Sequence, residues 1–199
     1  MRDSEALLSF WFGDLGDDGV PEDPVAERWF ESSPGFDAEL RERFGGLAEA
    51  ALAGELEDWS HSLRGRLALV LLLDQLTRNL FRGEAAAFSA DDRARALVED
   101  ALEQGIHHTL RPIERSIFYL PFMHAEDRAA QERSVALYTE LAAESPPALA
   151  ERLNRNLDFA KRHQSVIALF GRFPSRNEAL GRESTDAESA FLAEHPSGF

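Results

Sequence analysis

The sequence LRGRLALVLLLDQLTRNLFRG fills residues 63–83 and decides the fold, because its first half is apolar on every side. On a helical wheel of about 100° per residue, Leu69 and Leu73 lie on one side and Leu67 and Leu71 on the other. A helix that is apolar all round is buried all round in a globular protein. We therefore predict a central, buried helix across this stretch.

The second half of the same helix carries polar side chains. On the wheel they fall within an arc of about 140°, and they are Asp74, Gln75, Arg78, Asn79 and Arg82. Asp74 and Arg78 stand four residues apart, in the order that favours an ion pair. Because a charge removed from water must be paired or must bind something, the arc predicts either a structural polar network or a donor-rich pocket. In a pocket, these donors suit an anionic or carbonyl-bearing ligand.

A second Arg-Asn motif lies near the C-terminus. The segment GRFPSRNEALGR at 171–182 repeats the hydroxyl-Arg-Asn order of the central helix. It adds four candidate ligand-binding residues, which are Arg172, Arg176, Asn177 and Arg182. If the two motifs meet, they make a locally positive site in an acidic protein, and that contrast can focus an anionic ligand. The alternative is a structural network in which the arginines pair with Asp74, Glu114, Glu126, Asp127 and Glu183.

The rest of the chain also has helical periodicity. Apolar residues recur at helical spacing in 37–54, 89–104, 112–123, 131–141 and 148–170, and no segment alternates with the two-residue period of a strand. About two thirds of the chain is assigned to helix, well above the usual third. We predict a single all-α domain over residues 1–199, with roughly eight or nine helices stacked as antiparallel pairs.

Composition excludes several functional classes. The chain has 199 residues, a formal net charge of −15 and no cysteine. Nucleic acid is not expected as a partner, because neutralising phosphates needs a basic surface. The lack of cysteine excludes disulfides, thiolate catalysis and zinc-thiolate sites, and it fits a cytoplasmic protein. No apolar run reaches the roughly 18 residues of a membrane span, so no membrane is expected as a partner.

The second candidate locus follows Pro121, because a proline inside a helix kinks or ends it. The candidate catalytic residues there and on the next long helix are His124, Glu126, Asp127 and His163. A histidine can act as a base near neutral pH when a carboxylate orients it. The chain has no HExxH, Gly-x-Ser-x-Gly, Walker or dinucleotide motif. We therefore expect no metal and no cofactor, and the sequence leaves open whether the protein is an enzyme.

Large aromatic residues gather near the N-terminus, namely Trp11, Phe12, Trp29 and Phe30. Apolar side chains of this size are chiefly buried, so we expect core positions. The alternative is that they form a docking surface for a protein partner.

Several ordered motifs resemble those of one bacterial family. They are FWFG at 10–13, LDQLTRN at 73–79, LPFMHAE at 120–126 and FGRFPSRN at 170–177. Together they span nearly the whole chain and resemble the uncharacterised family called domain of unknown function 924. The resemblance implies a helical array similar to the tetratricopeptide-repeat superfamily, and no established activity. The family often has Phe-Pro where this chain has Leu76 and Thr77, so we expect the helix to continue to Arg78 without a proline kink.

Three functional hypotheses arise from these residues. The first is a binding module whose Arg/Asn-rich pocket between helices takes an anionic small molecule or a peptide. The second is a hydrolase-type or metal-assisted enzyme that uses His124 with nearby carboxylates. The third is a protein-interaction scaffold with a purely structural polar core. We take the binding module as the working prediction.

Overall fold

The computed structural model describes residues 2–16, 19–21, 28–29, 33–196 and 198 of the chain. The α-helices are α1 (Arg2–Phe12), α3 (Pro34–Leu52), α4 (Leu63–Val70), α5 (Thr77–Leu80), α6 (Asp91–Glu103), α7 (Pro112–Phe118), α8 (Leu120–Met123), α9 (Arg128–Ala143), α10 (Ala150–Phe170) and α11 (Asp186–Glu194). A π-helical segment, Leu71–Leu76, joins α4 to α5. Short 3-10 helices are η1 (Glu57–His61), η3 (Ala85–Phe88), η4 (Ile106–Thr109), η5 (Pro147–Leu149) and η6 (Pro174–Arg176).

These residues form helices and no strand, so the all-α prediction is confirmed. If α4, the π-helical segment and α5 are taken as one helix, and α7 and α8 as another, the described part of the chain contains eight helices, as expected. Within that same part, no helix is both long enough and apolar enough to cross a membrane.

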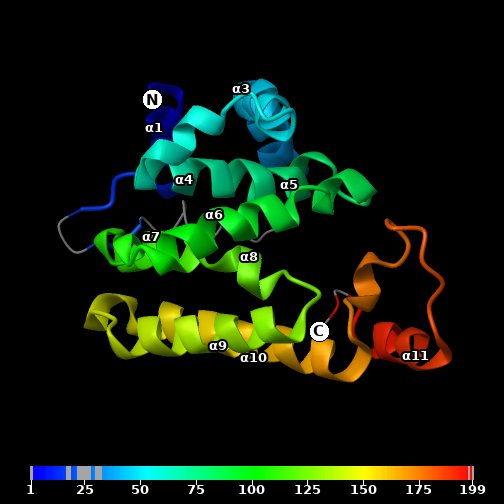
Figure 1. The fold of residues 1–199 in the computed structure, drawn as a ribbon. Coiled ribbons are helices and arrows are strands. Elements are labelled where there is room, and N and C mark those ends of the chain that lie inside the picture. Colours follow the sequence, from blue (N-terminus) through cyan, green and yellow to red (C-terminus); the bar gives the residue numbers. More distant parts are fainter. Residues whose placement is uncertain (1, 17–18, 22–27, 30–32, 197, 199) are drawn as a thin grey trace.

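The helices are stacked in successive rows (Figure 1). In that view α1 and α3 lie at the top, α4, α5 and α6 in the middle, and α9 and α10 along the bottom, with α11 at one side. Each row contacts the next: α1 packs on α4, α4 on α6, α6 on α8, and α8 on α9. Most buried apolar side chains form one cluster from Leu7 to Ala160. A smaller cluster of Val166, Ile167 and Phe173 lies where α10 meets η6.

The buried helix expected over 63–83 is present at the centre of this stack. Every residue from 67 to 77 is buried. The Oγ of Ser62 caps its first turn by accepting a hydrogen bond from the backbone N–H of Gly65, at 3.1 Å. Only glycine fits at position 65, because a Cβ there would collide with the backbone carbonyl of Trp59. The helix then continues through Thr77 without a proline kink, as expected.

One turn of this helix differs from the prediction. The segment Leu71–Leu76, which includes Asp74 and Gln75, is π-helical rather than α-helical. A π turn holds one residue more than an α turn, so it rotates all later side chains by about 100° relative to an α-helical wheel. Such segments occur frequently at functional sites.

The break expected at Pro121 is confirmed as a bend at Tyr119, between α7 and α8. Pro121 lies in the first turn of α8. Backbone N–H groups of a first turn have no acceptor within the helix, so proline loses no hydrogen bond there. After the bend, the buried Nε2 of Gln131 donates to the backbone carbonyls of Met123 at 2.7 Å and Ala125 at 2.8 Å. Gln131 of α9 thereby fixes the backbone on both sides of His124.

The N-terminal aromatic side chains belong to the core. Trp11, Phe12 and Trp29 are at most 4% exposed. The rings of Trp11 and Trp29 stack with their centres 6.3 Å apart, and Nε1 of Trp29 donates to the carbonyl of Trp11 at 2.7 Å. Core positions are confirmed for these three residues, and the docking-surface alternative is wrong for them. Phe30 lies outside the described residues.

Candidate binding site

A buried carboxylate, Asp74, lies at the centre of the site and is 0% exposed. Nε2 of Gln75 donates to its Oδ2 at 2.6 Å, Nη1 of Arg78 lies 3.2 Å from its Oδ1, and Nδ1 of His124 lies 2.9 Å from the same oxygen. Burial opposes ionisation, but the charge of Arg78 and the contact with His124 hold the pKa of Asp74 well below its ordinary value. The Asp74–Arg78 ion pair expected from the sequence spacing is confirmed.

Arg78 connects this carboxylate to a second one, Asp91, at the first residue of α6. Its Nη1 donates to Oδ1 of Asp91 at 3.0 Å and its Nη2 donates to Oδ2 at 2.9 Å. Nη1 also donates to the backbone carbonyl of Asp74 at 2.6 Å. Such a bidentate pair fixes both orientation and charge, so the guanidinium of Arg78 is committed to protein partners.

Arg176 reaches the same carboxylate from the second Arg-Asn motif. It ends η6, and its Nη1 donates to Oδ2 of Asp91 at 3.3 Å. Its Nη2 donates to the backbone carbonyl of His124 at 2.7 Å. The structure therefore brings the arginines of the two motifs together at Asp91.

The guanidinium of Arg176 is enclosed by aromatic rings. It lies 4.6 Å from the ring centre of Phe88 and 4.6 Å from that of Phe173, a distance at which the ring faces attract a cation. Burial, followed by the neighbouring charge of Arg78, lowers the pKa of Arg176 to about 10. The side chain is 12% exposed and keeps its charge at neutral pH.

His124 is held in one orientation by Asp74, whose two oxygens lie 2.9 and 3.0 Å from its Nδ1. Because Asp74 is ionised, Nδ1 carries the proton and donates it, and Nε2 keeps its lone pair. Within the described part of the chain, the hydrogen bonds of this ring are made by Nδ1 alone. Burial, helped by the charges of Arg78 and Arg176 and opposed by Asp74, lowers the pKa of His124. The ring is therefore neutral at pH 7.

His163 on α10 lies beside His124, with the two ring centres 5.9 Å apart. Its Nδ1 donates to the backbone carbonyl of Phe159 at 2.8 Å, and its ring packs against Phe173 at 5.4 Å. Burial, followed by the proximity of His124, lowers the pKa of His163 to about 3. This histidine therefore remains neutral well below physiological pH.

A His163→Phe variant is expected to show a flatter dependence of stability on pH. The unfolded chain takes up a proton here below the ordinary pKa of 6.5, whereas the folded chain stays neutral down to about pH 3. Above pH 6.5 neither state is protonated at this residue, and it takes nothing from the free energy of unfolding. Below pH 6.5 it lowers that free energy by up to about 1.4 kcal/mol for each pH unit. Urea unfolding at pH 7, 6 and 5 measures the slope, with His61→Phe as an exposed control. Parallel slopes for wild type and His163→Phe would contradict the expectation.

A surface depression of about 370 Å³ opens beside these residues. Its polar wall includes Asp91, His124 and Arg176, and its apolar wall includes Ala85, Phe88, Pro121 and Leu180. The volume lies within the range of small-molecule sites, and most of the lining residues are polar or charged.

The other acidic side chains of this wall already have partners. Asp92 pairs with Arg95 at 3.2 Å. Oδ1 of Asp127 caps α9 by accepting from the backbone N–H of Ala130 at 2.7 Å. The catalytic candidate Asp127 therefore has a structural contact, and it does not orient His124.

Glu126, the other carboxylate among the catalytic candidates, pairs with Arg182. Nη1 of Arg182 donates to its Oε2 at 2.6 Å and Nη2 donates to its Oε1 at 2.9 Å, while the backbone N–H of Phe173 donates to Oε1 at 2.8 Å. Burial opposes ionisation, but these donors lower the pKa of Glu126. The carboxylate that orients His124 is Asp74 instead.

Arg172 and Asn177 tie α11 to η6 through Glu188. Nε of Arg172 donates to Oε1 of Glu188 at 2.6 Å, and Nδ2 of Asn177 donates to Ser184 at 3.0 Å. The hydrogen bond from Arg172, opposed by burial, lowers the pKa of Glu188 to about 2. The pair of Arg182 with Glu126 belongs to the structural network that was the alternative to a pocket. Arg172 and Asn177 have structural partners too, but these are Glu188 and Ser184, which that alternative did not include.

Asn79 and Arg82 lie away from the depression, on the side of α3. Nδ2 of Asn79 donates to Oδ1 of Asp37 at 2.7 Å, and Nη2 of Arg82 lies 2.9 Å from Oδ2 of the same residue. The α-helical wheel placed both residues on one arc with Asp74. Asn79 comes one residue after Arg78 and therefore points about 100° away from it. Arg82 lies beyond the end of α5 at Leu80.

Three residues of this region carried no signal in the sequence, and they are Asp37, Phe88 and Asp91. Asp91 stands in the first turn of a helix, where acidic residues are common for local reasons. Phe88 lies in a short alanine-rich segment that shows no periodicity. Their roles depend on contacts between distant segments, which a single sequence does not display.

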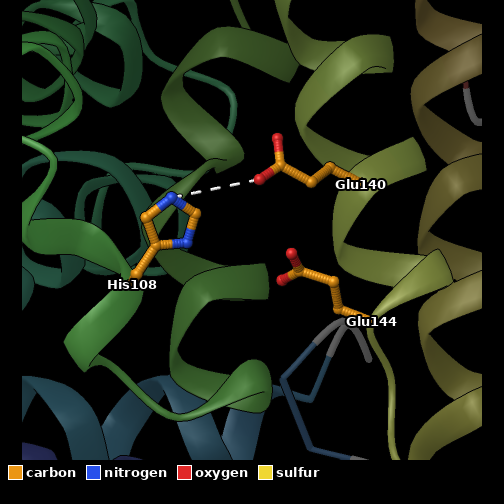
Figure 2. A group of neighbouring side chains, drawn as sticks. All are labelled: His108, Glu140 and Glu144. Atoms are coloured by element: carbon orange, nitrogen blue, oxygen red, sulfur yellow. Dashed lines mark ion pairs between the residues drawn. The ribbon is translucent and has the colours of Figure 1, made fainter.

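One further group among the described residues could hold a metal ion. Potential ligand atoms of His108, Glu140 and Glu144 lie within 4.8 Å of one another. Figure 2 shows the imidazole facing the carboxylates of Glu140, on α9, and of Glu144, directly after it. Nη1 of Arg115 donates to Oε2 of Glu144 at 3.0 Å and lies 3.4 Å from Nδ1 of His108. The guanidinium of Arg115 already places a positive charge beside these ligand atoms, which disfavours a metal ion. That no metal binds stays a prediction.

Comparison with known proteins places the chain in a family. The model of the family described as bacterial protein of unknown function (DUF924) matches residues 7–196. The solved structure of ATU0120, a protein of unknown function from Agrobacterium tumefaciens, is 34% identical, covers 96% of this chain and 97% of that one, and has a TM-score of 0.79. A search of curated proteins gave no match. The chain belongs to the DUF924 family of bacterial proteins.

Proposed function

We propose that the protein binds a small organic oxyanion, a carboxylate or a phosphate, in the depression beside Arg176. The observation that carries this proposal is the placement of Arg176 in the wall of the depression, between two phenylalanine rings. Arginine is suited to such ligands because its planar donors match the geometry of carboxylates and phosphates.

The charge of Arg176 is weakly compensated by the protein. Asp91, its carboxylate partner, already makes two hydrogen bonds with Arg78, and the contact with Arg176 is longer, at 3.3 Å. A guanidinium has five N–H donors, and the hydrogen bonds of Arg176 to the described residues come from Nη1 and Nη2. Donors therefore remain for a ligand oxygen.

The surroundings increase the attraction of this cation for an anion. Phe88 and Phe173 keep water from the faces of the guanidinium, and electrostatic interactions strengthen where water is excluded. The neighbouring carboxylates of the wall are engaged by other residues. A local cation in a chain of net charge −15 also gives the site contrast with the rest of the surface.

The test is thermal unfolding of wild type, Arg176→Gln and Arg172→Gln with sodium acetate, sodium phosphate or sodium chloride at equal ionic strength. A ligand at 100 times its Kd adds about 2.7 kcal/mol, which raises Tm by roughly 5–10 °C for a chain of this size. We expect acetate or phosphate to raise the Tm of wild type and of Arg172→Gln, whose guanidinium pairs with Glu188. For the Arg176→Gln variant, the Tm in acetate or phosphate should equal its Tm in chloride. No shift in wild type, or an equal shift in Arg176→Gln, would overturn the proposal.

We also propose a structural superfamily and a cellular location for the protein. The stacking of α9 against α10 across a short connection supports a relation to the tetratricopeptide-repeat superfamily, whose units are helix pairs. The lack of cysteine supports a cytoplasmic location, because disulfides are rare in the reducing environment of the cytosol.

A further inference from the structure

We propose that His124 is a general base and that the protein hydrolyses small carboxylic esters in the depression beside Arg176. This inference rests on the proposed function, because the carboxylate released by hydrolysis is an oxyanion of the class expected at Arg176. It assigns the chemistry of the bound ligand, whereas the proposed function assigns only its binding.

His124 is paired with Asp74. A buried carboxylate on Nδ1 fixes the ring orientation and leaves Nε2 as the basic nitrogen. The same carboxylate stabilises the imidazolium that forms when Nε2 accepts a proton, as in hydrolases in which an aspartate orients the base. Asp74 is a positioning residue here, because it acts through His124.

His124 lies in the wall of the depression. Its Nδ1 is engaged by Asp74, so Nε2 is the nitrogen that remains for a water molecule or a ligand. The apolar part of the wall, with Phe88, Pro121 and Leu180, suits the acyl or alkyl part of an ester.

A cation, the guanidinium of Arg176, lies beside the base. Nη2 of Arg176 lies 2.7 Å from the backbone carbonyl of His124, so base and guanidinium occupy adjacent parts of one wall. A fixed hydrogen-bond donor near the oxygen that becomes negative stabilises the transition state of acyl transfer and accounts for a large part of the rate enhancement. Ser89 also lines the depression, but its hydroxyl donates to the carbonyl of Ala86 at 2.9 Å. Water is therefore the nucleophile in this proposal.

The steps balance without a further reactant. Nε2 of His124 takes a proton from water while the water oxygen bonds to the ester carbonyl carbon, and the C=O electron pair moves onto the oxygen held by Arg176. That pair then re-forms the C=O bond as the bond to the alkoxy oxygen breaks. The imidazolium returns its proton to the leaving alkoxide. The products are a carboxylic acid and an alcohol, and His124 is neutral again.

The test is hydrolysis of p-nitrophenyl acetate by wild type, His124→Asn and His61→Asn, followed as p-nitrophenolate release over many turnovers. The amide of asparagine can donate to Asp74 in place of Nδ1 but cannot act as the base. His61 is exposed and controls for hydrolysis by surface imidazoles. We expect the rate to fall at least tenfold in His124→Asn and to stay unchanged in His61→Asn, since general bases contribute about 10²–10⁴-fold.

Circular dichroism and the acetate-dependent Tm shift show whether His124→Asn is folded and still binds. If wild type is no faster than His124→Asn, or if His61→Asn loses as much rate, the inference is overturned. A wild type that acetate stabilises but that does not hydrolyse the ester overturns this inference and leaves the proposed function standing. A wild type stabilised by neither acetate nor phosphate overturns both.

Discussion

An Arg78→Ala variant is expected to lose about 3–5 kcal/mol of unfolding free energy. The guanidinium lies between two carboxylates, 3.2 Å from Asp74 and 2.9 Å from Asp91, and Asp74 is completely buried. Removing one partner of a buried ion pair leaves a charge that neither water nor protein compensates. For a chain of this length the loss corresponds to a fall in Tm of roughly 6–20 °C.

Thermal and urea unfolding measure this loss, and Arg155→Ala is the matched control. Arg155 makes an ion pair with Glu151 at 2.7 Å, with side chains that are 64% and 90% exposed, so its removal should cost about 1 kcal/mol or less. In an Asp74→Asn background the carboxylate charge is already absent, and the loss caused by Arg78→Ala should shrink. Equal losses in the two backgrounds would show that Arg78 does not compensate the charge of Asp74. An Arg78→Ala protein as stable as wild type would make this arginine, too, a candidate for direct ligand binding.

Local spacing was enough to predict part of this site. Asp74 and Arg78 are four residues apart on one helix, and this spacing brings their side chains together in any α-helical or nearly α-helical backbone. The bend at Pro121 and the buried faces of the central helix are likewise consequences of residues close in sequence. These features were predicted from the sequence because each depends on one segment.

The remainder of the site depends on tertiary contacts that no local pattern contains. Asp91 lies 13 residues from Arg78 and 85 residues from Arg176, so its role appears only when α5, α6 and η6 are packed together. The repeat of the Arg-Asn pair supplied a second set of candidate donors, and one arginine of each motif does contact Asp91. It could not show that the other donors of the two motifs pair with Asp37, Glu126 and Glu188.

The helical wheel was right for the first half of the central helix and for Arg78, and it failed for Asn79 and Arg82. Up to Val70 the backbone is α-helical and the predicted buried faces hold. Beyond it, Arg78 faces α6. Asn79, one residue later and about 100° away on the helix, and Arg82, which follows the end of α5, face α3. A polar network of this kind both holds neighbouring helices and leaves Arg176 and His124 at the surface depression. The proposed binding role therefore falls to Arg176, while Arg78 has a structural role.

The second large effect is expected for Trp29→Ala, which should lose about 3–5 kcal/mol of unfolding free energy. Trp29 is 4% exposed and packs against Trp11 and Phe12 of α1, with ring centres 6.3 and 5.7 Å away. The guanidinium of Arg152, on α10, lies 5.9 Å from its ring. Removing the indole leaves a cavity between α1 and its neighbours that the core can only partly close.

Thermal unfolding followed by circular dichroism measures the effect, and two further variants separate its causes. Trp29→Phe keeps an aromatic ring but removes the N–H that donates to the carbonyl of Trp11, so it should cost less than Trp29→Ala, with about 1 kcal/mol arising from the hydrogen bond. Phe159→Ala removes an aromatic ring that is 39% exposed and should change stability by about 1 kcal/mol or less. If Trp29→Ala instead kept the wild-type Tm, the indole would not be part of the core. A docking role for the N-terminal aromatic residues would then have to be considered again, because a side chain that does not stabilise the fold is available to a partner.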